Sequence, residues 1–89
     1  MTDDEVQVWL VERSYGNDED LVTLVFATKD GRRQLKKQLS HKMLYGKSIT
    51  AARTEPPEKL DEVKDESTRE RYAKEATRMA EKHAPDEEV

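Results

Sequence analysis

Two stretches near the start of the chain carry closely spaced apolar residues. In the first, Val6, Val8 and Leu10 occupy alternate positions, which is the period of a half-buried strand. The second is apolar at odd and even positions alike, a pattern typical of a strand covered on both faces. These patterns predict strands over 5–14 and 21–28. The polar residues between them predict a turn that pairs the strands as an antiparallel hairpin.

The stretch that follows allows two interpretations. Asp30 and Gly31 suit a tight hairpin turn that leads into a third strand. The competing pattern is helical, because helix-forming residues fill 32–45 and Gly46 stands where a C-terminal cap would. Apolar residues also recur there at every fourth position: Leu35, Leu39 and Met43. Since strict alternation is missing, the pattern favours a helix over 32–45.

The clearest helix lies near the end of the chain. Asp65 or Ser67 suits its N-cap, and Ser67 with Glu70 matches a capping box. Pro85 ends it. The apolar side chains of this segment fall within one stripe of a helical surface, and His83 lies on the same stripe: Tyr72, Ala76, Met79, Ala80 and His83.

Between the two helices, residues 48–54 suit a short strand. Pro56 and Pro57 end it, because a proline nitrogen cannot donate a ladder hydrogen bond. The sequence therefore predicts an α+β fold, a small three-stranded sheet with two helices in the order β-β-α-β-α. We expect a single domain over 1–84 and a loose acidic tail over 85–89.

Composition adds one uneven feature to this picture. The chain has 89 residues, 40% of them charged, and a net charge of -4. Residues 29–47 nevertheless hold seven Lys or Arg against Asp30 alone. An acidic protein thus contains one short, strongly basic segment.

The sequence lacks the residues that several kinds of functional site require. The chain has no cysteine, and His41 and His83 lie in different predicted helices with no nearby Ser or Asp arranged to activate a nucleophile. The three glycines are isolated, so no phosphate-binding loop is present. We therefore expect no enzyme activity, no metal or cofactor, and no small-molecule ligand. No apolar run is long enough for a membrane span, which predicts a cytoplasmic protein.

The first hypothesis for function is a non-enzymatic interaction or regulatory module that self-associates through an apolar sheet face or an edge strand. If both helices pack on one side of the sheet, the other side exposes an apolar patch. Trp9 and Val11 are then candidate interface residues, with Trp9 as the anchor. This hypothesis predicts a homo-oligomer.

The alternative hypothesis is a nucleic-acid-binding accessory protein that uses residues 29–47. The side chains that would contact a polyanion are basic: Arg32, Arg33, Lys36, Lys37, Lys42 and Lys47. No aromatic residues for base stacking are interleaved with the first four of them. An acidic protein partner, or acidic segments of the same chain, would satisfy these charges equally well.

Three motifs carry a resemblance to a known group of proteins. They are Val8-Trp9-Leu10-Val11-Glu12-Arg13, the strand Leu21-Val22-Thr23-Leu24-Val25, and the helical Arg69-Glu70-Arg71-Tyr72-Ala73 with Arg78-Met79-Ala80. Together they resemble a family of short uncharacterised haloarchaeal proteins of unknown function. The resemblance implies a cytosolic protein in molar salt, where phosphate contacts are strongly screened, and it carries no known site residues.

Overall fold

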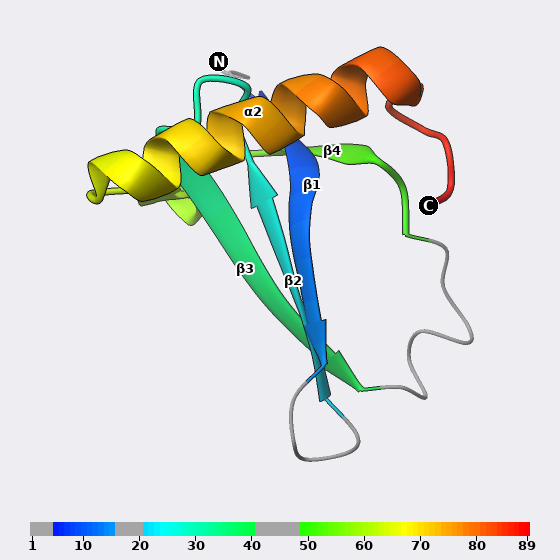
Figure 1. Cartoon of the computed structure of the whole chain (residues 1–89). Coiled ribbons are helices and arrows are strands. Elements are labelled where there is room, and N and C mark those ends of the chain that lie inside the picture. Colours follow the sequence, from blue (N-terminus) through cyan, green and yellow to red (C-terminus); the bar gives the residue numbers. More distant parts are fainter. Residues whose placement is uncertain (1–4, 16–20, 41–48) are drawn as a thin grey trace.

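The computed structural model describes residues 5–15, 21–40 and 49–89 (Figure 1). The strands and helices, in chain order, are β1 (Val6–Tyr15), β2 (Leu21–Ala27), β3 (Arg33–Ser40), β4 (Ala52–Glu55), the 3-10 helix η1 (Pro57–Lys59), β5 (Asp61–Glu62) and α2 (Glu66–Lys82). The five strands form one antiparallel sheet in the order β4-β1-β2-β3-β5. The predicted three-stranded sheet with two helices is therefore wrong, although the α+β class is correct.

The N-terminal hairpin is confirmed. β1 and β2 pair in antiparallel register from Trp9 opposite Ala27 to Tyr15 opposite Val22, with a bulge between Leu10 and Glu12. A bulge increases local twist and bends the strand. This one lies where β1 passes beneath α2.

The predicted helix over 32–45 is wrong where the structure describes it, because residues 33–40 form strand β3. β3 pairs with β2 from Gln34 to Ser40. Leu35 and Leu39 pack against the core, and Lys37 lies between them on the same face. Residues four apart share a face in a strand as well as in a helix, so their spacing could not separate the two structures. Residues 41–45 lie outside the described residues.

The turn at Asp30 and Gly31 explains why the residues after it form a strand and not a helix. Gly31 is buried and has φ +71°, a left-handed conformation that glycine adopts without strain. The backbone nitrogen of Gly31 donates to the carbonyl of Thr28 at 2.9 Å, and that of Thr28 donates to the carbonyl of Arg33 at 3.1 Å. These bonds close a hairpin between β2 and β3.

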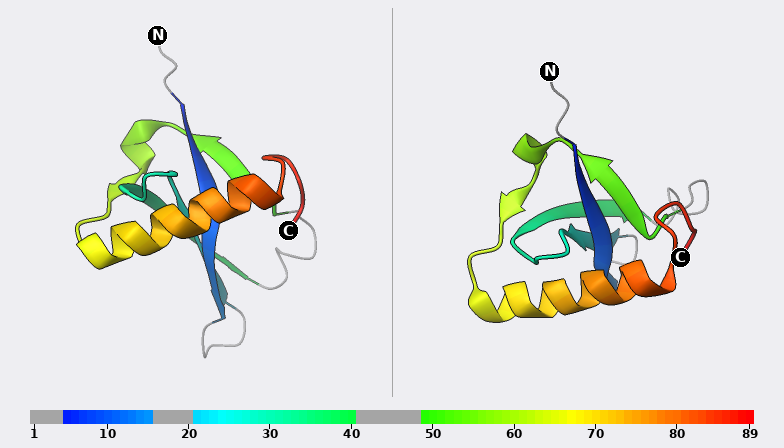
Figure 2. Two further views of the ribbon diagram at one scale, coloured as in Figure 1. Left: turned by 45° about the horizontal axis from the view of Figure 1, so that its top comes forward. Right: turned by 90° about the horizontal axis from the view of Figure 1, so that it is seen from above.

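Two short strands complete the sheet. β4 begins later than the predicted 48–54, and Pro56 and Pro57 follow it as expected. The connection through η1 then leads from β4 at one edge of the sheet to β5 at the other edge (Figure 2). β5 has only two residues, both acidic and exposed, so no hydrophobic alternation marked it in the sequence.

Helix α2 begins after Asp65, which is one of the two residues predicted as its N-cap. The carboxylate of Asp65 accepts hydrogen bonds from the backbone nitrogen of Thr68 at 2.9 Å and from its hydroxyl at 2.8 Å. Ser67 is therefore not the cap. On the predicted apolar stripe, Tyr72 and Ala76 are buried, and the helix ends before Pro85. Within the described residues, no helix has the length and apolar character that crossing a membrane requires.

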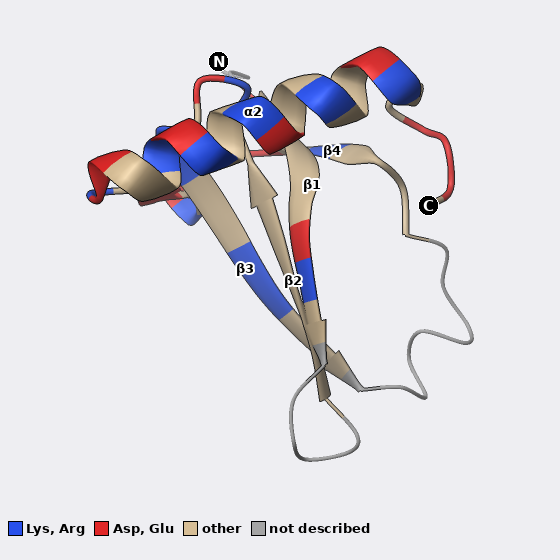
Figure 3. Cartoon of the chain, in the orientation of Figure 1, with Lys and Arg blue, Asp and Glu red and all other residues tan. Residues whose placement is uncertain are grey.

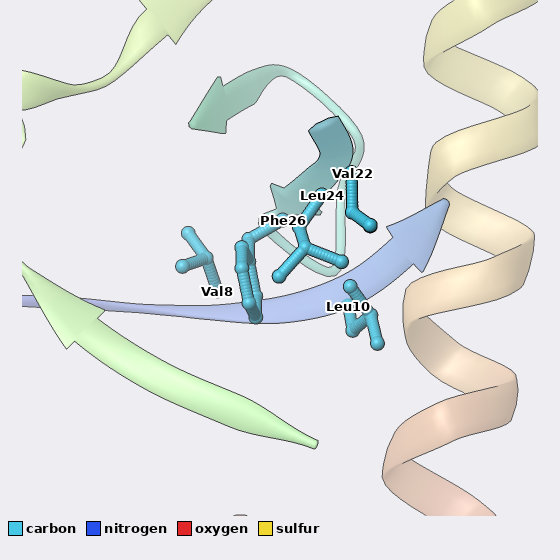
Figure 4. Packing of buried hydrophobic residues seen from close by; sticks show 5 residues of the cluster. All are labelled: Val8, Leu10, Val22, Leu24 and Phe26. Atoms are coloured by element: carbon cyan, nitrogen blue, oxygen red, sulfur yellow. The ribbon is translucent and has the colours of Figure 1, made fainter. Parts of the chain in front are cut away.

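One face of the sheet is covered by the curl of the sheet itself. We call it the inner face, and its buried residues are Val8, Leu10, Val22, Leu24 and Phe26 (Figure 4). Leu39 on β3 and Ile49 before β4 pack against this same cluster, although β1 and β2 separate β3 from β4 in the sheet. The sheet must therefore curl, which removes the need for a second helix.

The opposite face packs beneath α2, and we call it the helix face. Trp9 lies there with Ala76 of the helix, and Val25 lies there with Tyr72. Trp9 is only 4% exposed. Both faces of the sheet are thus covered. Among the described residues, the large apolar side chains with substantial exposure are Leu21 and Val89.

The C-terminal segment runs beside the chain that leads into β4. The backbone nitrogens of Ala51 and Ala52 donate to the carbonyls of Glu87 and Pro85, at 2.8 and 3.0 Å, and the nitrogen of Val89 donates to the carbonyl of Ile49 at 2.9 Å. The segment expected to form a loose tail thus supplies hydrogen-bond partners to one edge of the sheet.

Replacing Gly31 by alanine should destabilise the fold. An added Cβ would lie 2.0 Å from the carbonyl oxygen of Arg69, and alanine would also have to adopt a positive φ. We expect Gly31→Ala to lower the free energy of unfolding by about 2–4 kcal/mol. Urea denaturation followed by circular dichroism measures this. Thr77→Ala, on the exposed side of α2, is the control and should change little. Equal stability of the two variants would contradict the docked turn.

Trp9 should behave as a core residue. We expect Trp9→Ala to lower the free energy of unfolding by about 3–5 kcal/mol, because it removes a side chain buried against α2. Leu21→Ala, a truncation at a residue 38% exposed, should cost less than about 1 kcal/mol. Denaturant unfolding and light scattering are measured together. If the Trp9 variant kept the stability of the natural protein but formed a smaller assembly, Trp9 would instead be an interface residue.

Candidate anion-binding site

The turn between β2 and β3 is held by its own side chains. The hydroxyl of Thr28 donates to the carboxylate of Asp30 at 2.5 Å, and the backbone nitrogen of Arg32 donates to the same oxygen at 3.0 Å. These two hydrogen bonds, with the nearby charges of Arg32 and Arg33, hold the pKa of Asp30 below its ordinary value. Because the turn is fixed, the residues that leave it have defined positions.

Further contacts join this turn, α2 and the chain around β5 to one another. Gly31 lies against the backbone of α2 at Arg69. The backbone nitrogen of Val63 donates to the carbonyl of Arg32 at 2.8 Å. The Nε of Arg69 donates to the carbonyl of Val63, and its Nη2 lies 3.6 Å from a carboxylate oxygen of Glu62. Three segments distant in the sequence thus meet at one point.

These contacts bring three arginines to one open cavity of about 710 Å³, which we call the arginine groove. Arg32 and Arg33 are exposed, and neither forms a side-chain ion pair within the described part of the chain. Arg69 is half-buried. The rest of the lining combines two acidic and two apolar residues: Glu58, Glu62, Pro57 and Leu60.

The chemistry of the groove follows from its guanidinium groups. A guanidinium is charged at all physiological pH values and presents a planar set of donors that fits a carboxylate or a phosphate. Arg69 already has partners, so Arg32 and Arg33 are the groups that remain for a ligand. The two carboxylates in the lining oppose a densely charged polyanion and favour a ligand with separated negative charges.

The predicted basic residues do not gather on one surface. Arg32 and Arg33 line the groove, while Lys36 is exposed on the helix face of β3. Figure 3 shows Lys and Arg residues spread over β1, β3 and α2. Lys37 is half-buried on the inner face, where it lines a different cavity. Because β3 is a strand, successive basic residues alternate between its two sides. Lys42 and Lys47, like His41, lie outside the described residues.

The predicted interface residues are placed in the interior. Trp9 is buried, with the Nζ of Lys29 5.9 Å from the centre of its ring. Val11 is half-buried beneath α2. Neither residue forms an exposed apolar patch in this fold.

Sequence reasoning did not find Arg69 or Glu62 as site residues. Both are far in the sequence from the basic segment, and only the turn at Asp30 and Gly31 hinted at the hairpin that brings them together. Among the residues that the structure describes, no group of three or more His, Asp or Glu side chains is placed to hold a metal ion.

Comparison with known protein families finds a match. A model of a family of unknown function, DUF7967, matches residues 2–89. The chain belongs to this family. No curated protein and no solved structure matches the sequence or fold of this DUF7967 protein. The expected membership of a family of unknown function is confirmed, whereas the haloarchaeal origin stays a prediction.

Low pH should weaken the turn between β2 and β3, which positions the arginines of the groove. Since the pKa of Asp30 is lowered in the folded state, its contribution to stability is complete above its ordinary value of about 4 and is lost as the pH falls through the lowered value. We expect the stability difference between the natural protein and Asp30→Asn to shrink from pH 7 toward pH 2. Urea unfolding across this range measures it. A difference independent of pH would contradict the assignment.

Proposed function

We propose that this DUF7967 protein is a non-enzymatic interaction module that binds an acidic protein partner through the arginine groove. The observation that carries the proposal is the convergence of Arg32, Arg33 and Arg69, from two separate parts of the chain, in one open cavity. The first two are exposed and lack side-chain ion pairs among the described residues.

An acidic protein segment suits the groove better than a nucleic acid for two reasons. Glu58 and Glu62 lie beside the arginines and would repel a continuous run of phosphates. The aromatic side chains whose exposure is known, Trp9, Phe26 and Tyr72, are buried and offer no platform for bases. Pro57 and Leu60 add apolar contact area, which a protein partner can use.

Self-association remains part of the proposal only through an edge strand. β5 pairs with β3 at Arg33 and Gln34 alone, so within the described residues the outer edge of β3 from Leu35 onward has no neighbouring strand. Such an edge can accept another strand, although its lysines discourage close pairing with a second copy of itself. An acidic partner strand meets no such repulsion.

Charge reversal in the groove tests this proposal. We expect Arg32→Glu/Arg33→Glu to weaken binding of a fluorescein-labelled peptide, in which seven glutamates alternate with serines, at least about tenfold at low salt, because two cationic contacts become repulsive. Fluorescence anisotropy measures the affinity. A single-stranded oligothymidylate of equal charge is measured in parallel.

The matched control is Lys74→Glu/Lys82→Glu, which makes the same change in net charge at two exposed positions of α2. Equal losses in the two double variants would show that only net charge matters and would contradict the groove. Tighter binding of the oligothymidylate than of the peptide would instead support the nucleic-acid hypothesis.

A further inference from the structure

A second cavity, of about 390 Å³, lies on the inner face and is lined from β2, β3 and the β4 region. Four apolar side chains form part of its lining: Leu24, Phe26, Leu39 and Ile49. Lys37 and Arg53 bring two positive charges to the same space. The eight lining residues are therefore half apolar and half polar, and apolar surface beside convergent polar groups is the usual form of a small-ligand site.

Arg53 is held in place from two sides. Its guanidinium carbon lies 5.7 Å from the centre of the Phe26 ring, a distance typical of a cation–π contact. Its Nε lies 2.5 Å from a carboxylate oxygen of Glu55, whose side chain is 9% exposed. That Nε makes no aligned hydrogen bond, so the contact is an ion pair. The side chain of Arg53 is still 37% exposed, which leaves part of the guanidinium accessible.

The register of the sheet explains why these groups share a cavity. Arg53 pairs with Val8, and Lys37 pairs with Leu24, so both basic residues project from the inner face. The curl of the sheet then brings β3 and β4 to opposite sides of the cavity. The hydroxyls of Thr50 and Thr54 add polar groups to the lining, although the hydroxyl of Thr50 already donates to the carbonyl of Ala52 at 2.7 Å.

We propose that this cavity binds a small organic anion. The carboxylate of the ligand lies against Lys37 and Arg53, and its apolar body lies against Phe26, Leu39 and Ile49. The ligand needs an apolar body, because a hydrated inorganic anion could not make apolar contacts with these three side chains. The site does not use Arg32 or Arg33, so it stands independently of the arginine groove.

One residue in the lining of this cavity can serve as an NMR probe of ligand binding. Ile49 is the single isoleucine of the sequence, so protein labelled with ¹³C at the isoleucine δ1 methyl gives one signal from the lining. We expect 2-naphthoate to shift this signal saturably in the NMR spectrum. We expect 2-naphthylmethanol, which keeps the ring system without the charge, to bind at least about fivefold more weakly.

Two variants of neighbouring lysines sharpen the experiment. Lys37→Met should weaken 2-naphthoate binding about tenfold, because one charge contact is lost. Lys36→Met makes the same change one residue earlier, on the helix face, and should leave affinity within about twofold. Arg32→Glu/Arg33→Glu should also leave it nearly unchanged, which separates this site from the groove.

Three results would overturn the inference. They are the absence of a saturable shift at Ile49, equal affinities for the charged and uncharged probes, and equal affinities in the Lys37 and Lys36 variants. If Lys37→Met fails to fold, the comparison of the two probes on the natural protein decides the question, because it needs no substitution.

Discussion

The close contact between Gly31 and the backbone of α2 is the constraint on which the rest of this structure depends. A Cβ at this position would overlap the carbonyl oxygen of Arg69. The absence of a side chain therefore lets the hairpin turn approach the helix directly. The same contact sets the direction of β3 and brings Arg32 and Arg33 beside Arg69. Fold and candidate site thus share one cause.

The second organising feature is the curl of the sheet. A sheet with apolar residues on both faces normally needs cover on both sides. In this DUF7967 protein α2 covers one side, and the strands at the two edges, with Ile49 and Leu60, close over the other. A chain of 89 residues thereby covers both faces of its sheet with one α-helix in its described part.

The distribution of charge follows from β3 being a strand at the margin of this curled sheet. Its alternation places Arg33 and Lys37 on the same side of the strand, Arg33 at the arginine groove and Lys37 at the second cavity. Lys36 points to the other side. One short basic segment therefore serves two separate cavities, and the acidic residues around it keep the whole protein negatively charged.

Sequence patterns alone determined the elements whose signal is local. The alternation of Val6, Val8 and Leu10 identified β1 because a half-buried strand has a period of two. The N-cap of α2 was narrowed to Asp65 or Ser67 because capping depends on the three following residues, and the structure selects Asp65. Membership of a family of unknown function was also recognised from motifs within single elements.

Tertiary structure decided what local patterns left open. The spacing of Leu35 and Leu39 fits a helix and a strand equally, and only the docking of Gly31 on α2 separates them. Burial of Trp9 depended on where the helix would lie. The arginine groove joins residues 32 and 69, and no local period relates side chains so far apart in the chain. Their proximity is a property of packing, because it requires the turn, the strand after it and the helix to meet.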